Sequence, residues 1–96
     1  GTLEVPIGLT LTGWTIESDQ TGDIVIDVKK STYSGYPTTS SIAGSEKPTL
    51  SAAQKNQDLT LSSWTTTVTA GDILEFIVDS VSTITRVSLT LRGTRT

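Results

Sequence analysis

The side chains that could carry chemistry in this chain are carboxylates and hydroxyls, because histidine and cysteine are both absent. Asp19 and Asp23 bracket a short polar stretch, and carboxylates placed this way suit the hard oxygen coordination of Ca²⁺. Their spacing matches no EF-hand loop, and such carboxylates more often stabilise a turn by accepting hydrogen bonds. We therefore expect no metal and no other cofactor.

An enzyme active site is not expected either. General acid–base catalysis uses histidine most often, and a serine or threonine nucleophile would need a lysine base that nothing here singles out. Two carboxylates could flank a glycosidic bond, but the 10 Asp and Glu residues also suit a domain kept soluble by its charge. The composition favours a non-enzymatic protein.

Tyr33 and Tyr36 are the candidate ligand-binding aromatics. They lie in a long stretch without periodicity, beside small residues that leave their ring faces open. Loop tyrosines can stack on sugar rings or anchor a protein contact, or they can fold back over the core. Lys29 and Lys30 lie close by and would add polar contacts to a sugar, although the solvated end of a strand explains them equally well.

Charge and hydropathy exclude two classes of partner. The formal net charge is −3 and the seven Lys and Arg residues are scattered, so the clustered basic surface of a nucleic-acid-binding protein is missing. No apolar run approaches the roughly 20 residues that a membrane-spanning helix requires. We expect neither nucleic acid nor membrane as a partner.

The elements that would position these side chains are strands. Threonine and serine make up 31 of the 96 residues, a composition that favours pleated sheet. Apolar residues occupy odd positions from Leu3 to Leu11 and even positions at Trp14 and Ile16, which predicts a β-bulge near Thr12-Gly13. The other expected elements are a turn over 18–22, a strand over 23–30, an irregular stretch over 31–48, a helical turn over 50–55, a turn over 70–72, a central strand over 73–78, a turn over 80–83 and a strand over 85–92.

Alternation also predicts which side chains face the core. The residues expected to point inward from the later strands are Ile24, Ile26, Val28, Val87, Leu89 and Leu91. Those expected to point outward from the strand over 23–30 are Val25, Asp27 and Lys29.

An internal repeat organises the chain. Leu9-Thr10-Leu11-Thr12-Gly13-Trp14-Thr15 returns as Leu59-Thr60-Leu61-Ser62-Ser63-Trp64-Thr65, and a Gly-Asp-Ile triplet follows each copy. The repeat predicts two matched strand–Trp–turn–strand units, each contributing one tryptophan to a shared core. We expect a single domain over 1–96, an antiparallel, jelly-roll-like β-sandwich of about seven strands.

Several segments in this order resemble a known β-sandwich module. They are Leu11-Thr12-Gly13-Trp14-Thr15, Gly22-Asp23-Ile24-Val25-Ile26-Asp27-Val28, Thr32-Tyr33-Ser34-Gly35-Tyr36-Pro37, Gly44-Ser45-Glu46-Lys47-Pro48-Thr49-Leu50, Trp64-Thr65-Thr66, Ala70-Gly71-Asp72-Ile73-Leu74 and Val78-Asp79-Ser80-Val81. The module recurs in tailed-bacteriophage virion surface proteins such as tail-fibre-like, receptor-binding and decoration proteins.

The resemblance implies a non-enzymatic component on the virion surface that forms a homotrimer and contacts other virion proteins. It also implies that this component can contact a host-surface glycan or protein. It also implies a further β-segment ahead of Leu3, so the chain, which begins at Gly1, is expected to be a fragment of a longer protein. Lys29-Lys30 stands where the family pattern suggests an aromatic residue, which weakens any transfer of a binding surface. The alternative is a carbohydrate-binding module of a secreted bacterial enzyme, monomeric and binding glycan through Tyr33 and Tyr36.

Overall fold

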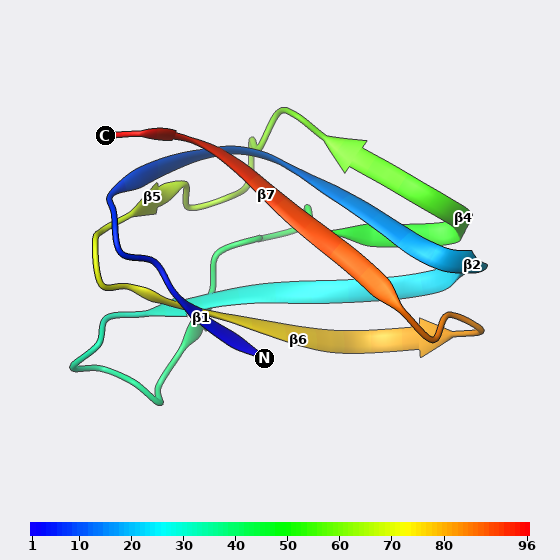
Figure 1. Cartoon of the computed structure of the whole chain (residues 1–96), viewed down its shortest axis with the longest axis horizontal. Coiled ribbons are helices and arrows are strands. Elements are labelled where there is room, and N and C mark those ends of the chain that lie inside the picture. The colour runs from blue at the N-terminus through cyan, green and yellow to red at the C-terminus, as the bar shows by residue number, and fades with distance from the viewer.

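Every regular element of the chain is a β-strand, and every strand pairing is antiparallel. The computed structural model describes residues 1–96 (Figure 1). Its strands are β1 (Thr2–Glu4), β2 (Leu9–Ser31), β3 (Ser40–Ser41), β4 (Thr49–Asp58), β5 (Thr67–Val68), β6 (Ile73–Ser82) and β7 (Val87–Arg95). The predicted all-β antiparallel class is confirmed. No helix in the structure could cross a membrane.

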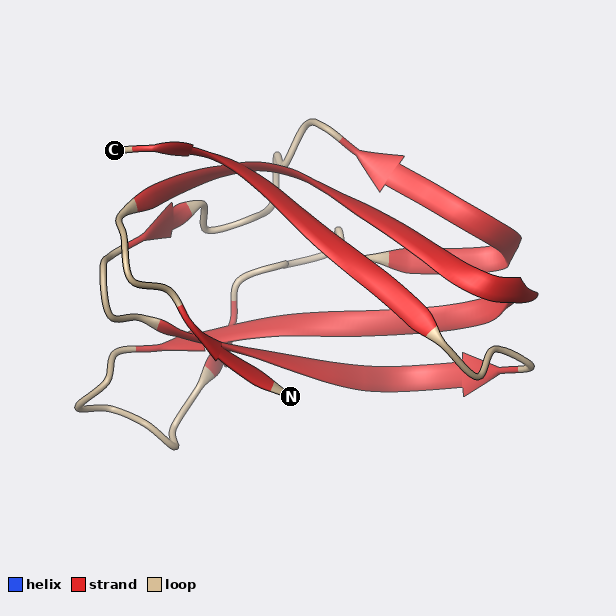
Figure 2. Ribbon diagram, in the orientation of Figure 1, coloured by secondary structure: helices blue, strands red, loops and turns tan.

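The seven strands form one hydrogen-bonded sheet that bends back on itself. Residues 9–18 of β2 pair with β7, β5 and the end of β4, whereas residues 22–31 pair with β6, β3 and the beginning of β4. The bend lies between Glu17 and Gly22, where the register between β2 and β4 shifts. Figures 1 and 2 show the two arms of β2 facing each other, with β7 beside one arm and β6 beside the other.

The core fills the space between these arms. The alternation of β2 places Ile16 on one arm and Ile24, Ile26 and Val28 on the other, all of them buried. Full burial of such side chains is worth roughly 1.5–3 kcal/mol each. The buried apolar residues are Val5, Leu11, Trp14, Ile16, Ile24, Ile26, Val28, Ile42, Ala43, Leu50, Trp64, Val68, Leu74 and Ile84.

The predicted irregularity at Gly13 is present. The register between β2 and β7 shifts between Leu11 and Gly13. A Cβ atom at Gly13 would lie 2.7 Å from the Asp58 carbonyl oxygen, so glycine lets the neighbouring backbone approach closely. This bulge moves the buried phase of the strand from Leu11 to Trp14.

The second copy of the repeat does not form the predicted strand. Leu59 is 58% exposed, and the chain between Asp58 and Thr67 is irregular. The Asp58 carboxylate accepts a hydrogen bond from the Thr60 N–H, which turns the chain away at the end of β4. Trp64 still reaches the core, but contacts between loops hold it there instead of a strand ladder.

Two further predictions are wrong. Residues 50–55 form part of β4, because an isolated helical turn closes few hydrogen bonds while β2 offers a ladder that pairs Ile24 with Leu50. Asp27 was expected to face solvent, but it is only 5% exposed. The segment after β3 covers it, as described below.

Candidate functional site

The loop after β2 carries the two tyrosines that the sequence singled out. Tyr33 is 77% exposed and Tyr36 is 43% exposed. The loop projects from one end of the folded sheet, at the lower left of Figure 1, and closes locally through the bond from the Tyr36 N–H to the Thr32 carbonyl. Neither tyrosine lines a hollow of the surface, so any sugar contact here would be stacking on an open ring face.

The two lysines do not join the tyrosines in one pocket. Lys30 donates a hydrogen bond of 2.6 Å to the Thr67 carbonyl and lies 3.8 Å from the Asp72 carboxylate. Its charge is therefore engaged beside β5 and the turn before β6. Lys29 is half-buried and lies in register with Ser41 of β3 and Glu75 of β6. Glycan binding by these four residues stays a prediction.

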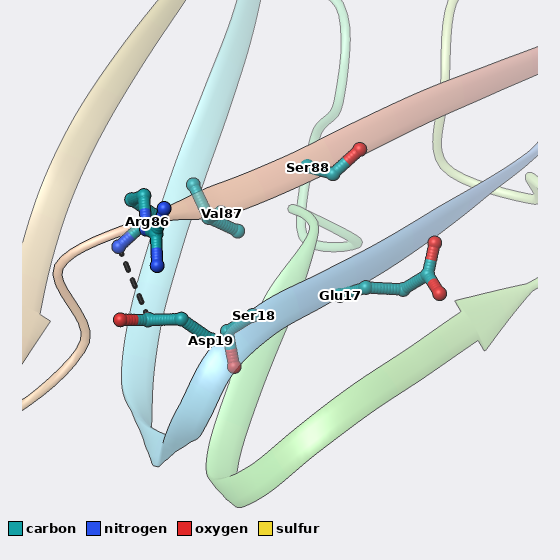
Figure 3. Close-up of a pocket in the computed structure, with 6 residues that line it drawn as sticks. All are labelled: Glu17, Ser18, Asp19, Arg86, Val87 and Ser88. Atoms are coloured by element: carbon teal, nitrogen blue, oxygen red, sulfur yellow. Dashed lines mark hydrogen bonds between the residues drawn. The ribbon is translucent and has the colours of Figure 1, made fainter.

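Asp19 and Asp23 connect the bend of β2 to neighbouring segments. The Asp19 carboxylate accepts a hydrogen bond of 3.1 Å from the Arg86 N–H (Figure 3). It also accepts one of 3.3 Å from the Thr85 N–H and one from the Thr85 hydroxyl. Asp23 accepts one of 2.6 Å from the Ala52 N–H. The two carboxylates thus stabilise the bend by accepting hydrogen bonds, as expected for carboxylates at a turn. Their partners, however, are distant in sequence.

The hollow beside Asp19 has a volume of about 330 Å³, and Val87 is the one hydrophobic residue among those that line it. Its lining consists of Glu17, Ser18, Asp19, Arg86, Val87 and Ser88 (Figure 3). The Thr85 hydroxyl, followed by the Arg86 N–H, lowers the pKa of Asp19 below its ordinary value. Asp19 is therefore ionised at neutral pH and acts as a hydrogen-bond acceptor.

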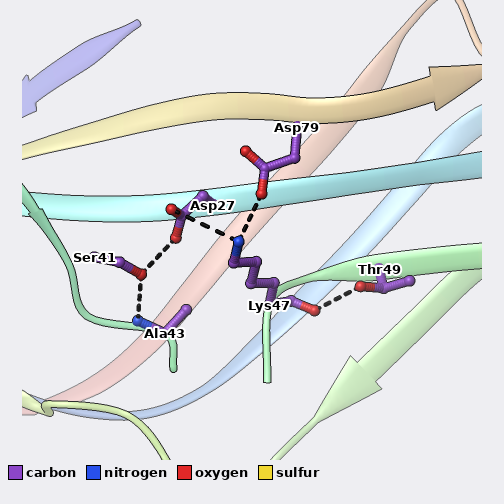
Figure 4. Close-up of polar contacts among 6 residues, drawn as sticks. All are labelled: Asp27, Ser41, Ala43, Lys47, Thr49 and Asp79. Atoms are coloured by element: carbon purple, nitrogen blue, oxygen red, sulfur yellow. Dashed lines mark hydrogen bonds and ion pairs between the residues drawn. The ribbon is translucent and has the colours of Figure 1, made fainter. Parts of the chain in front are cut away.

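A polar cluster under the segment after β3 explains the buried Asp27. The Ser41 hydroxyl donates to Asp27 Oδ1 at 2.7 Å, and Lys47 Nζ lies 3.9 Å from Asp27 Oδ2 and 2.7 Å from Asp79 Oδ2 (Figure 4). The hydrogen bond to Asp79 raises the pKa of Lys47, so its amine stays protonated. The cluster ties the segment between β3 and β4 to β2 and β6, which is a structural role.

Glu46 joins the two long irregular segments. Its backbone carbonyl accepts a hydrogen bond of 2.9 Å from Trp64 Nε1, and its carboxylate accepts bonds from the Ser62 hydroxyl and the Ser63 N–H. The bonds from Ser63 lower the pKa of Glu46 to about 2. This contact holds Trp64 in place without a strand around it.

One apolar surface does not join segments of the chain in this way. Two adjoining hollows, of about 280 and 230 Å³, lie where β6 and β1 face β7, and both are lined by Phe76 and Leu89. Val78 lines the first hollow together with Ile26 and is 51% exposed. The sequence predicts a central strand over 73–78, which would have a neighbouring strand on each side. On the outer side of β6, β1 pairs only with residues 73–75. Alternation alone does not reveal that this part of the interior is open.

Comparisons of this chain with family models, curated proteins and solved structures find no match.

Proposed function

We propose that this chain is a non-enzymatic structural module of a bacteriophage virion surface protein, such as a tail fibre, a receptor-binding protein or a decoration protein. It acts as a homotrimer on the outside of the particle and contacts other virion proteins. The segment-by-segment resemblance in sequence supports the virion assignment. The all-β fold is compatible with it.

The observation that carries the proposal is the open apolar groove between β6 and β7. A soluble protein that works alone covers its interior side chains and protects its sheet edges, whereas an assembly module leaves them for a neighbouring chain. Val78 belongs to the interior face of β6 and yet is 51% exposed. Association would remove this surface from water.

A second candidate function is glycan binding, as in a carbohydrate-binding module of a secreted bacterial enzyme. The projecting loop with Tyr33 and Tyr36 favours it, because exposed tyrosine rings stack readily on sugars. In that case the chain is a monomer. On a virion, the same loop would contact a host-surface glycan.

Light scattering over a dilution series tests the leading proposal. A trimer that persists on dilution and melts at a concentration-dependent temperature supports the virion module. A chain that stays monomeric at high concentration contradicts the trimer. If it also binds a glycan array, and if the double variant Tyr33→Ala/Tyr36→Ala abolishes that binding, the chain is a carbohydrate-binding module.

A further inference from the structure

We infer that the outer face of β2 near its bend, centred on Glu17, is a binding site for a neutral oligosaccharide. The inference deepens the proposed function by locating a glycan contact and naming its chemical class. It rests on that function only for the origin of the glycan at a host surface, since the site itself follows from the side chains of three paired strands.

Three hollows of the surface share Glu17. Their volumes are about 330, 470 and 580 Å³. Glu17 lies opposite Ser88 of β7 on one side and opposite Lys55 of β4 on the other. Figure 3 shows Glu17 and Ser88 on neighbouring strands, with Arg86 lining the same hollow. The hollows therefore adjoin one another, and the Glu17 side chain stands between them.

The lining of these hollows suits hydroxyl groups. Ala53 and Val87 are the only hydrophobic residues among those that line them. A sugar hydroxyl both donates and accepts hydrogen bonds. The carboxylate and amide oxygens of the site can accept bonds from such a hydroxyl, and its ammonium and guanidinium groups can donate bonds to it. An apolar ligand would find little surface to contact.

The charged side chains of the site are free to contact a ligand. Glu17, Lys55 and Arg86 are exposed, and their side chains make no hydrogen bond and no ion pair within the chain. Glu17 and Lys55 face each other in register without pairing. Hydrogen bonds to charged groups are stronger than those between neutral groups, so these side chains would dominate the binding of a hydroxyl-rich ligand.

The charges of the site cancel, which favours a neutral ligand. Glu17 and Asp19 carry the negative charges, and Lys55 and Arg86 carry the positive ones. An acidic or a basic ligand would meet repulsion as well as attraction across the site. A neutral oligosaccharide uses all four side chains as donors or acceptors without that repulsion.

Hydrogen bonds to β2 hold the glutamines around Glu17 in place. Gln57 Nε2 donates to Thr15 Oγ1 at 2.9 Å, and Gln54 Nε2 donates to the Ser18 carbonyl at 3.2 Å. Each glutamine thus keeps its Oε1 as an acceptor for a ligand. Because the site lies on paired strands, its groups are positioned before a ligand binds, which reduces the entropy lost on binding.

A glycan array that displays neutral and acidic oligosaccharides tests the inference, and calorimetry measures the Kd of the best neutral ligand. Glu17→Ala and Arg86→Ala should each raise this Kd by at least about tenfold, because each removes a hydrogen bond to a charged group. Glu4→Ala and Arg95→Ala are the matched controls and should leave the Kd unchanged. Both controls replace exposed charged residues at the ends of strands that make no ion pair.

Three results would overturn the inference. The first is an array with no ligand, or with acidic ligands only. The second is binding of a neutral ligand that Glu17→Ala and Arg86→Ala leave unchanged. The third is binding that only Tyr33→Ala/Tyr36→Ala abolishes, which would place the glycan on the tyrosine loop at the opposite end of the sheet (Figure 1).

The oligomeric state, measured separately, distinguishes the inference from the proposed function. A trimer that binds no glycan overturns the site and leaves the virion module standing. A monomer whose glycan binding depends on Glu17 and Arg86 supports the site and contradicts the trimer.

Discussion

The two tryptophans, equivalent in the sequence repeat, should respond differently to replacement by phenylalanine. Both are buried, but Trp64 Nε1 donates a hydrogen bond to the Glu46 carbonyl, whereas Trp14 Nε1 has no acceptor in the protein. Each replacement removes a similar apolar area, so that loss largely cancels in the comparison. Trp64→Phe also leaves a carbonyl unpaired, at about 1–3 kcal/mol, and Trp14→Phe removes a buried unpaired N–H, which recovers about 1–3 kcal/mol.

The difference in unfolding free energy between the two variants should therefore be about 2–6 kcal/mol, with Trp64→Phe the less stable. For a domain of this size that corresponds to at least about 10 °C in Tm. Urea denaturation followed by circular dichroism, at one fixed protein concentration, measures it. As a control, replacing either tryptophan with alanine should cost about 3–5 kcal/mol, because both fill the core. Equal losses for the two phenylalanine variants, or a larger loss for Trp14→Phe, would refute the reasoning.

Three further predictions follow from individual contacts. Gly13→Ala should destabilise the chain by about 1–3 kcal/mol in urea denaturation, since its Cβ would meet the Asp58 carbonyl at 2.7 Å; wild-type stability would contradict the close approach. Glu46 has a pKa lowered from 4.5 to about 2, so its contribution is complete above 4.5 and is lost as the pH falls towards 2. The stability advantage of wild type over Glu46→Gln should shrink over that interval, and a constant advantage would argue against the contact with Ser63. Asp27→Ala should destabilise by about 1–3 kcal/mol, because it removes the acceptor of the Ser41 hydroxyl, while Lys47 keeps its contact with Asp79. A loss below about 1 kcal/mol would show that Asp27 contributes little.

Periodicity predicted much of the fold. The alternation in β2 identified Ile24, Ile26 and Val28 as interior residues, and the phase change located the bulge at Gly13. Both features are local, because a strand has a side-chain period of two and an inserted residue shifts it. The segment 50–55 was misread because its propensities are weak and the partner strand that decides its structure lies far away in sequence.

The candidate site was less predictable than the fold. The sequence singled out Tyr33 and Tyr36, and the structure exposes both, but it places the Lys30 amine against Thr67 and Asp72 instead of beside them. The groove at Val78 could not be inferred from the sequence. Alternation predicts that an apolar residue at an inward position is buried, whether or not a neighbouring strand covers it.

Composition and alternation are properties of consecutive residues, so they establish that the chain is all-β, that it has no histidine or cysteine chemistry, and which strand faces are apolar. Tertiary contacts, by contrast, make the two copies of the repeat differ, cover Asp27, and leave an apolar groove between β6 and β7. These features depend on which distant segments meet. Burial and strand pairing are set by neighbours in space, and no local pattern encodes them.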